Sequence, residues 1–109
     1  MIDGQWRPAD QPAGQFHAHN PATGALLPGA YPVSRWADIE AALAAAGRAV
    51  VELRQTPPAA LADFLEKYAA GMEARGDALA QAAHEETALA LEARLRNNEL
   101  PRTIRQLRL

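Results

Sequence analysis

Beyond residue 33, apolar side chains recur along the chain at helical spacing. Between residues 34 and 53 they fall three or four positions apart, which predicts one amphipathic helix. The members of this stripe are Trp36, Ile39, Leu43, Ala46, Val50 and Leu53. Ser34 is a favourable N-cap, and Asp38 and Glu40 lie near the positive end of the helix dipole. We expect this helix to stop at the sequence QTPP.

Two further helices are predicted between Thr56 and residue 83. Thr56 can cap the first of them and Pro57 can open it. Its expected buried residues are Leu61, Phe64 or Leu65, Tyr68 and Met72. Gly76 is a natural residue to follow its last turn, and Asp77 can cap a short helix through Leu79 and Ala83.

The C-terminal pattern predicts two more helical segments. Residues 89–96 form the first, which we expect to end at Asn97-Asn98. Pro101 is expected to begin the second, with Leu100, Ile104 and Leu107 on one side. The pattern continues up to Leu109, as we would expect of a fragment or a partly described chain.

The first 33 residues have a different character, because five of the eight prolines fall there and exclude a long helix. Residues 1–6 and 14–20 are predicted as short strands joined by residues 7–14. The sequence NPATG at 20–24 predicts a turn in which Gly24 takes a positive φ. Residues 25–33 continue as a short extended piece. The organisation is therefore a hairpin and turn segment over 1–33 and a helical segment over 34–109.

Composition changes this picture in one respect. About half of the 49% hydrophobic content is alanine, and the larger apolar side chains number only 27 of 109 residues. Alanine lets helices approach closely but buries little surface of its own. We therefore expect these helices to pack against polypeptide outside this chain.

Charge and cysteine content exclude several classes of protein. The net charge of −2 gives no reason to expect a nucleic-acid partner, and no run of about 18 apolar residues predicts a membrane span. Without cysteine there is no disulfide, thiol nucleophile or thiolate metal site. A cytoplasmic protein is the expectation.

Few residues offer recognisable chemistry. His17 and His19 share a face of a predicted strand, but only His84 remains as a further imidazole ligand, so we predict no metal site. Residues 84–88, HEETA, begin like the zinc motif HExxH but end in Ala88. No Gly-rich phosphate loop and no Ser-His-Asp spacing is present, so the residues alone assign no catalytic reaction.

Arginines make the C-terminal end basic, and two interpretations of them stay open. They are Arg94, Arg96, Arg102, Arg105 and Arg108. One interpretation is a polar helix face whose arginines pair with Glu92 and Glu99. The other is an arginine that receives an anionic group of a substrate.

Several short sequences, taken in series, resemble the N-terminal segment of the aldehyde dehydrogenase superfamily. They are IDGQW, NPATG, DIEAALAAAGRAV, TPP and HEETAL, and the resemblance covers essentially the whole chain. The sequence HEETALALEARLRNNELPRTIRQLRL is most similar to the branch that oxidises α-ketoglutaric semialdehyde (2,5-dioxovalerate). That branch carries ETAL where many relatives carry ETGK.

The resemblance implies an α+β fragment, in which an N-terminal β-hairpin is followed by four to five α-helices. These helices would form the outer layer of an α/β nucleotide-binding domain. It further implies a homo-oligomeric enzyme that oxidises a small aldehyde to a carboxylate with NAD or NADP. The family's cysteine nucleophile, water-activating glutamate and oxyanion-stabilising amide cannot be placed here, so no catalytic, cofactor-binding or metal residue is assigned. The isolated segment is expected to be inactive.

One position can be carried over from the family. The helix corresponding to NNELPRTIRQLRL lines the mouth of the aldehyde tunnel in relatives, which would place Arg102 and Asn98 on the tunnel wall. A guanidinium there could pair with a substrate carboxylate. The alternative is that Arg102 only pairs with Glu99.

Besides the aldehyde dehydrogenase hypothesis, two other functions remain open on the sequence alone. One is a small alanine-rich helical module that dimerises through its apolar stripes and has no catalytic activity. The other is a metal-binding protein that uses the histidines. An aldehyde dehydrogenase segment, whose partner is the remainder of the enzyme chain, is our first hypothesis.

Overall fold

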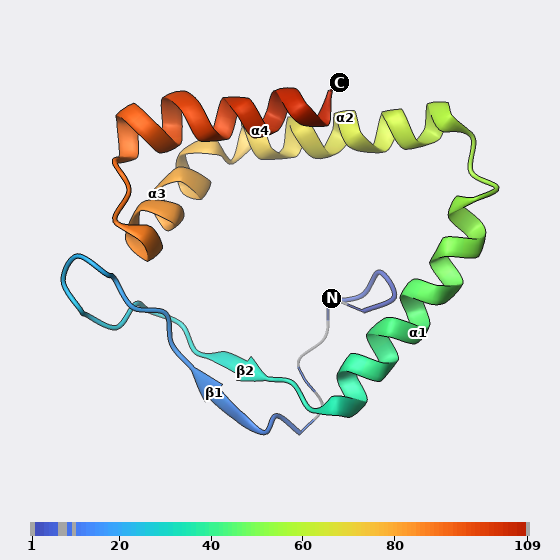
Figure 1. Cartoon of the computed structure of the whole chain (residues 1–109), viewed down its shortest axis with the longest axis horizontal. Helices are drawn as coiled ribbons and strands as arrows, with labels where there is room; N and C mark the ends of the chain where they lie inside the picture. The colour runs from blue at the N-terminus through green and yellow to red at the C-terminus, as the bar shows by residue number, and fades with distance from the viewer. Residues whose placement is uncertain (1, 7–8, 10, 109) are drawn as a thin grey trace. The chain divides into compact units, whose positions relative to one another are not determined.

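The computed structural model describes residues 2–6, 9 and 11–108, in which two short strands precede a series of helices (Figure 1). The chain divides into two compact units. One comprises Met1–His17 with Pro28–Thr56, and the other comprises Ala18–Leu27 with Pro57–Leu109. The predicted succession of a hairpin and then helices is confirmed.

In the first unit, β1 (Gly14–Phe16) pairs antiparallel with β2 (Tyr31–Val33). Gly14 lies opposite Val33 and Phe16 opposite Tyr31, whose ring is stacked on that of Phe16 at 5.4 Å between centroids. Cross-strand aromatic pairs of this kind stabilise short ladders. The hairpin therefore uses the extended piece after NPATG as its second strand.

The predicted strand over residues 1–6 is wrong. Ile2 and Gln5 instead close a tight turn through two backbone hydrogen bonds of 3.0 and 3.1 Å. Asp3 and Gly4 between them have φ values of 54° and 72°. Asp-Gly favours turns in which both central residues have positive φ, so the chain reverses where we expected it to extend. Part of the predicted connection, at residues 7, 8 and 10, lies outside the described residues.

Helix α1 (Trp36–Leu53) begins one residue later than predicted, with Arg35 rather than Ser34 at the N-cap. Arg35 instead donates a hydrogen bond from Nε to the carbonyl oxygen of Gln11. The predicted apolar stripe lies in solvent, since Trp36 is 67% and Leu43 63% exposed. Asp38 and Ala45 are the residues of α1 that are buried. The apolar stripe is therefore present in the helix, but the described residues of this unit leave it exposed.

Helix α2 (Pro58–Ala74) is also largely exposed. Pro58, not Pro57, is its first residue, and the Thr56 hydroxyl donates to the Glu52 carbonyl instead of capping α2. The predicted buried residues were Leu61, Phe64 or Leu65, Tyr68 and Met72. Both Phe64 and Leu65 are exposed, as are Leu61 and Tyr68, whereas Met72 is half-buried. The buried residue of α2 is Ala69, at 0% exposure. Close helix contact through alanine therefore replaces packing of large side chains.

Helix α3 (Gly76–Thr87) follows α2 after the single non-helical residue Arg75. Asp77 does not cap it, contrary to our prediction, and Gly76 is its first residue. A Cβ atom on Gly76 would lie 3.1 Å from Leu100 Cδ2, so the glycine permits close approach of Leu100. The helix ends at Thr87, and the next residue, Ala88, takes the left-handed conformation with φ of 57°.

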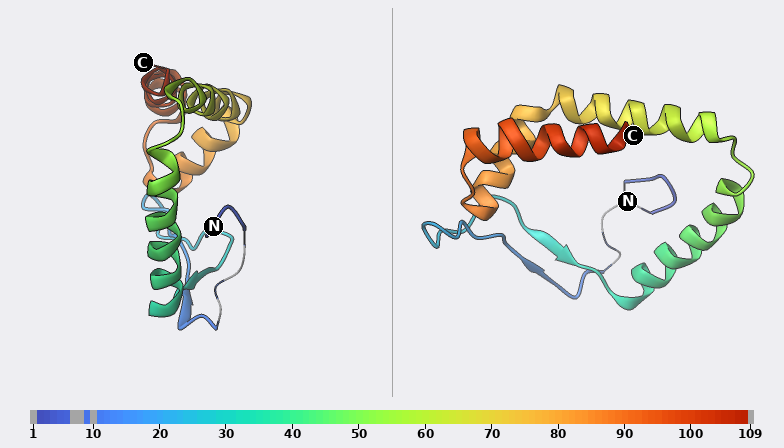
Figure 2. Two further views of the ribbon diagram at one scale, coloured as in Figure 1. Left: turned by 90° about the vertical axis from the view of Figure 1, so that its right-hand side faces the viewer. Right: turned by 45° about the horizontal axis from the view of Figure 1, so that its top comes forward.

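The last helix is continuous, although we expected a break at Asn97-Asn98. A π-helical segment, η1 (Leu91–Glu99), runs directly into α4 (Leu100–Leu107), and Glu99 and Leu100 both have right-handed helical angles. The final helix and α2 run side by side in the views of Figures 1 and 2, and α2 and α4 are in contact. Leu109, where the pattern was expected to continue, is not among the described residues.

The π-helix follows from the spacing of apolar residues. Leu91, Leu95, Leu100, Ile104 and Leu107 are separated by four, five, four and three positions. In an α-helix, residues five apart lie about 140° apart around the axis, which would turn Leu100 away from Leu95. The wider turns of a π-helix bring them back toward one side. Leu95 and Ile104 are accordingly buried, at 7% and 6% exposure.

The NPATG sequence forms the tip of a small antiparallel turn in the second unit. Asn20 Oδ1 accepts from the Ala22 backbone N–H at 2.9 Å, and the Gly24 N–H donates to the Asn20 carbonyl at 2.8 Å. His19 and Leu26 form an isolated bridge below it. Gly24 has the predicted positive φ, 72°. The sequence builds a corner through its own hydrogen bonds.

Candidate functional site

The two residues predicted to line a substrate tunnel, Asn98 and Arg102, lie at the junction of η1 and α4. Both are exposed, and the Arg102 side chain is 63% accessible. Arg102 Nη1 lies 3.9 Å from Glu99 Oε2. The predicted pairing with Glu99 is therefore present, but it is long and leaves most guanidinium donors of Arg102 available.

Arg94 contacts the other oxygen of the same carboxylate. Its Nε donates to Glu99 Oε1 at 3.3 Å. Residues five apart do not meet on an α-helix, so the π-helical winding of η1 creates this pair. We call Arg94, Glu99 and Arg102 the arginine–glutamate cluster. It holds two positive charges and one negative charge.

Arg96 belongs to a different group on the same helix. It pairs with Glu92, as the sequence led us to expect, and its Nε lies 3.1 Å from Asp77 Oδ1 at the start of α3. The two side chains line a hollow of about 410 Å³. Its walls are Glu73, Ala74, Arg75, Gly76, Asp77, Ala78, Arg96 and Leu100. Both signs of charge are present there, so the hollow favours neither anions nor cations.

Arg108 pairs with two carboxylates of α2. Its guanidinium donates to both oxygens of Glu73 at 2.7 and 2.8 Å, and its Nε donates to Glu66 at 3.0 Å. The hydrogen bonds from Arg108 lower the pKa of Glu73, and Glu73 in turn raises the pKa of Arg108. We call these contacts of Arg108 with Glu66 and Glu73 the clamp, and it joins the end of α4 to α2. Sequence reasoning missed Glu66 and Glu73 because they lie 42 and 35 positions from Arg108.

The histidines do not assemble a metal site in the described part of the chain, where no group of three or more candidate ligands occurs. His84 Nδ1 lies 2.6 Å from the carbonyl oxygen of Leu89, an acceptor, so that nitrogen carries the proton. His17 is half-buried and His19 exposed. We find no role for these side chains beyond local structure.

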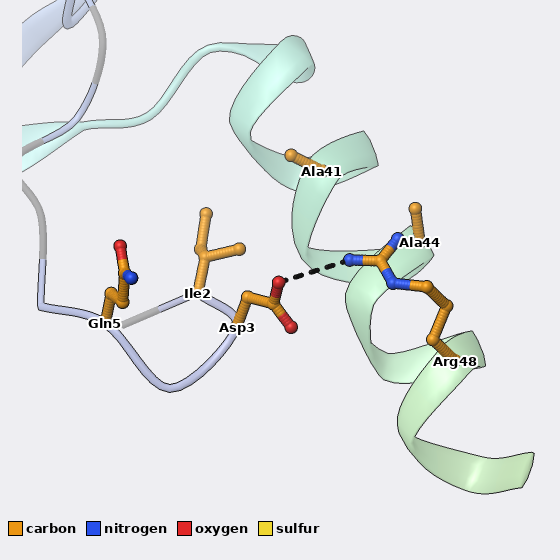
Figure 3. A pocket seen from close by; sticks show the side chains of 6 residues that line it. All are labelled: Ile2, Asp3, Gln5, Ala41, Ala44 and Arg48. Carbon is orange, nitrogen blue, oxygen red and sulfur yellow. Dashed lines mark hydrogen bonds and ion pairs between the residues drawn. The ribbon is translucent and has the colours of Figure 1, made fainter. Parts of the chain in front are cut away.

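The first unit contains a hollow between the N-terminal turn and α1 (Figure 3). Its volume is about 350 Å³, and Arg48 Nη2 contacts Asp3 Oδ2 across it at 3.4 Å. Ile2, Gln5, Ala41 and Ala44 complete the lining. Both charged side chains are more than half exposed, so this pair contributes little stability. The contact holds the turn near the helix without forming a chemically distinctive site.

Neither Gly71 nor Gly76 forms a phosphate cradle for a dinucleotide. A phosphate cradle needs glycines in a loop that leads into a helix, where the backbone can approach the pyrophosphate. Gly71 lies inside α2, and the missing Cβ of Gly76 accommodates Leu100. We therefore derive no catalytic step through a cofactor on this segment. The chain has no cysteine, so it also carries no thiolate nucleophile.

Comparisons with known proteins bear directly on this segment. The model of the aldehyde dehydrogenase family matches residues 6–109. Over 98 residues the chain is 42% identical to "Alpha-ketoglutaric semialdehyde dehydrogenase 2" of Azospirillum brasilense. That alignment covers 89% of this chain but only 18% of the relative. No solved structure gives a significant match.

Proposed function

This chain belongs to the aldehyde dehydrogenase family, and from that premise we propose that it is the N-terminal part of an NAD(P)-dependent enzyme. The enzyme would oxidise an aldehyde that carries its own carboxylate, such as α-ketoglutaric semialdehyde, to the corresponding acid. The observation that carries the proposal is the 42% identity to a relative named for that substrate, within a family match that runs from residue 6 to residue 109. The nucleophile and the cofactor site would lie elsewhere in the enzyme.

The exposed apolar residues support a structure whose helix faces pack against further polypeptide. Trp36, Leu43, Phe64 and Tyr68 are all more than half exposed, although their spacing is that of buried helix faces. Large apolar faces normally pack against another element. We propose that the remainder of the dehydrogenase chain covers these faces, and that the complete enzyme is a cytoplasmic homo-oligomer.

Within that enzyme, Arg102 is the proposed receptor for the substrate carboxylate, and Asn98 is a neighbouring part of the tunnel wall. Arg102 is exposed, and its ion pair with Glu99 is long. A planar guanidinium with free donors can bind a carboxylate in a bidentate manner. By binding the carboxylate at the end of the substrate away from the aldehyde, Arg102 would position the substrate without taking part in the oxidation.

The test is to compare Arg102→Leu with the original residue in the complete dehydrogenase. We expect KM for α-ketoglutaric semialdehyde to rise by roughly tenfold, because a charged hydrogen-bonded contact is lost. KM for pentanal, a neutral aldehyde of equal length, should stay within about twofold. Arg105→Leu, which removes another exposed arginine of α4, is the matched control. Equal effects of Arg102→Leu on both aldehydes would remove this role for Arg102.

A helical module that dimerises through its apolar stripes is the alternative function, and the exposed faces of α1 and α2 are its support. We favour the dehydrogenase because family membership extends over nearly all of the chain. Sedimentation of the isolated 109 residues distinguishes the two. A tight dimer whose dissociation exposes α1 would support the module, whereas a monomer that binds the rest of the dehydrogenase would support the enzyme.

A further inference from the structure

Two arginine sites on the last helix differ in how completely their donors are used. Arg108 meets two carboxylates, with four contacts between 2.7 and 3.0 Å. In the arginine–glutamate cluster, Arg94 and Arg102 share the single carboxylate of Glu99 at 3.3 and 3.9 Å. Good charge-assisted contacts are about 2.7–2.9 Å long. The donors of Arg108 are therefore taken up by Glu66 and Glu73 at short distance. The donors of Arg94 and Arg102 have only the longer contacts with Glu99.

The cluster also has the charge and the accessibility that a carboxylate receptor needs. Two guanidinium groups face one carboxylate, which leaves one positive charge in excess. The side chains of Arg94, Glu99 and Arg102 are 56%, 39% and 63% exposed. Exposed ion pairs are worth on the order of 0–1 kcal/mol, so an incoming anion can displace Glu99 from either arginine.

We propose that Glu99 is a specificity-determining residue that competes with the substrate carboxylate for Arg94 and Arg102. The inference rests on the proposed function, because it concerns the same carboxylate-bearing aldehydes, and it adds Arg94 and Glu99 to the site. In the structure of this chain Glu99 lies within 3.3 Å of Arg94 and 3.9 Å of Arg102, and we infer the same arrangement in the enzyme before substrate binds. A substrate with a terminal carboxylate takes its place, whereas a neutral aldehyde cannot.

The π-helical winding of η1 brings the residues of the arginine–glutamate cluster together. It brings Glu99 to the same side as Arg94, and the following α-helical turn brings Arg102 to Glu99 three positions later. π-helical segments are frequent at functional sites. The winding that keeps Leu95 and Leu100 on the packed side therefore also assembles the charged cluster on the exposed side.

The experiment uses the complete dehydrogenase with Glu99→Gln, which removes the competing charge and keeps the side-chain size. We expect KM for α-ketoglutaric semialdehyde to fall about threefold to tenfold, with kcat unchanged and KM for pentanal unchanged. Glu92→Gln is the matched control, since Glu92 lies on the same helix and pairs with Arg96, which is outside the cluster. Glu99→Ala serves as a second variant if Glu99→Gln does not fold.

A second measurement separates this inference from the proposed substrate. Glutarate, an unreactive dicarboxylate, is used as an inhibitor of pentanal oxidation, and its inhibition constant should fall about threefold to tenfold in Glu99→Gln. A wild-type enzyme that does not prefer the semialdehyde over pentanal would contradict the proposed substrate, and glutarate would still test the receptor. An unchanged or raised inhibition constant in Glu99→Gln would overturn the inference itself.

Discussion

Helices α1 and η1–α4 reverse the usual relation between a regular apolar pattern and burial. In α1 the apolar residues recur at regular α-helical spacing, yet Trp36 and Leu43 lie largely in solvent. Along η1 and α4 the spacing is irregular, yet Leu95 and Ile104 are among the most enclosed residues described. Periodicity identifies the face that can be buried. Whether it is buried depends on a partner, which η1–α4 finds in α2 and α3, whereas the described residues of the first unit leave the apolar face of α1 exposed.

The largest expected effect tests this contrast directly. Ile104→Ala should lower the free energy of unfolding of the helical unit by about 2–4 kcal/mol, because a buried side chain is replaced by a cavity. Leu43→Ala in the same isolated chain should change it by less than about 0.5 kcal/mol. Urea denaturation followed by circular dichroism measures both. In the complete dehydrogenase Leu43→Ala should become costly, by about 2 kcal/mol or more, and equal small effects in both settings would contradict a covering partner.

Gly76 and Gly71 offer the next comparison. Gly76→Val should destabilise the helical unit by about 1–3 kcal/mol, because its side chain would collide with Leu100. Gly71→Ala lies within α2, where an added Cβ would meet nothing within 4 Å, and should stabilise by about 0.5–1 kcal/mol. Thermal melting of the two variants checks the opposite signs. A stabilising Gly76→Val would show that Leu100 does not pack there.

Ala88 provides a smaller effect at the end of α3. Ala88→Gly should stabilise the chain by about 1 kcal/mol, because glycine adopts the left-handed conformation seen at Ala88 without the steric cost that alanine bears. Ala83→Gly, within the same helix, should instead destabilise by roughly 0.5–1 kcal/mol. Denaturation midpoints of the two variants give the comparison. Destabilisation by both would place Ala88 in ordinary helix.

The smallest expected effect concerns pH. Arg108 lowers the pKa of Glu73 in the folded chain. The pair therefore stabilises the folded state fully when the pH is above the ordinary pKa of a glutamate. This stabilisation is lost as the pH falls through the lowered value, when Glu73 becomes protonated in both states. Urea denaturation across the acid range should therefore show a shallower pH dependence in Arg108→Gln than in Arg105→Gln. Identical pH profiles would mean that the clamp does not form in solution.

Local rules predicted most of the elements but misplaced several boundaries. The order of hairpin and helices followed from proline content and periodicity, and Gly24 took its predicted conformation. The break expected at Asn97-Asn98 is absent because favourable packing of Leu95 and Leu100 outweighs the weak helix preference of asparagine. The sequence Asp3-Gly4 is typical of a turn and could have predicted the observed reversal, but we predicted a strand there instead.

The candidate site was predictable only in part. Resemblance predicted Asn98 and Arg102 as tunnel residues, which stays a prediction, and helical spacing allowed the pairing of Arg102 with Glu99. Arg94 could not be joined to them, because the contact of residues five apart requires a π-helix, which α-helical periodicity does not anticipate. The partners of Arg108 depend on how α4 lies against α2, which no local pattern determines.

The alanines at the most enclosed positions have a consequence for how this sequence tolerates change. Ala45, Ala69 and Ala80 are buried, while tryptophan, phenylalanine and tyrosine side chains lie outside. Enlarging any of these three alanines would force neighbouring backbones apart. A saturation library of the isolated segment should thus reject bulky replacements at its smallest residues and accept polar ones at its largest. In the complete enzyme proposed above, both groups of positions should become intolerant.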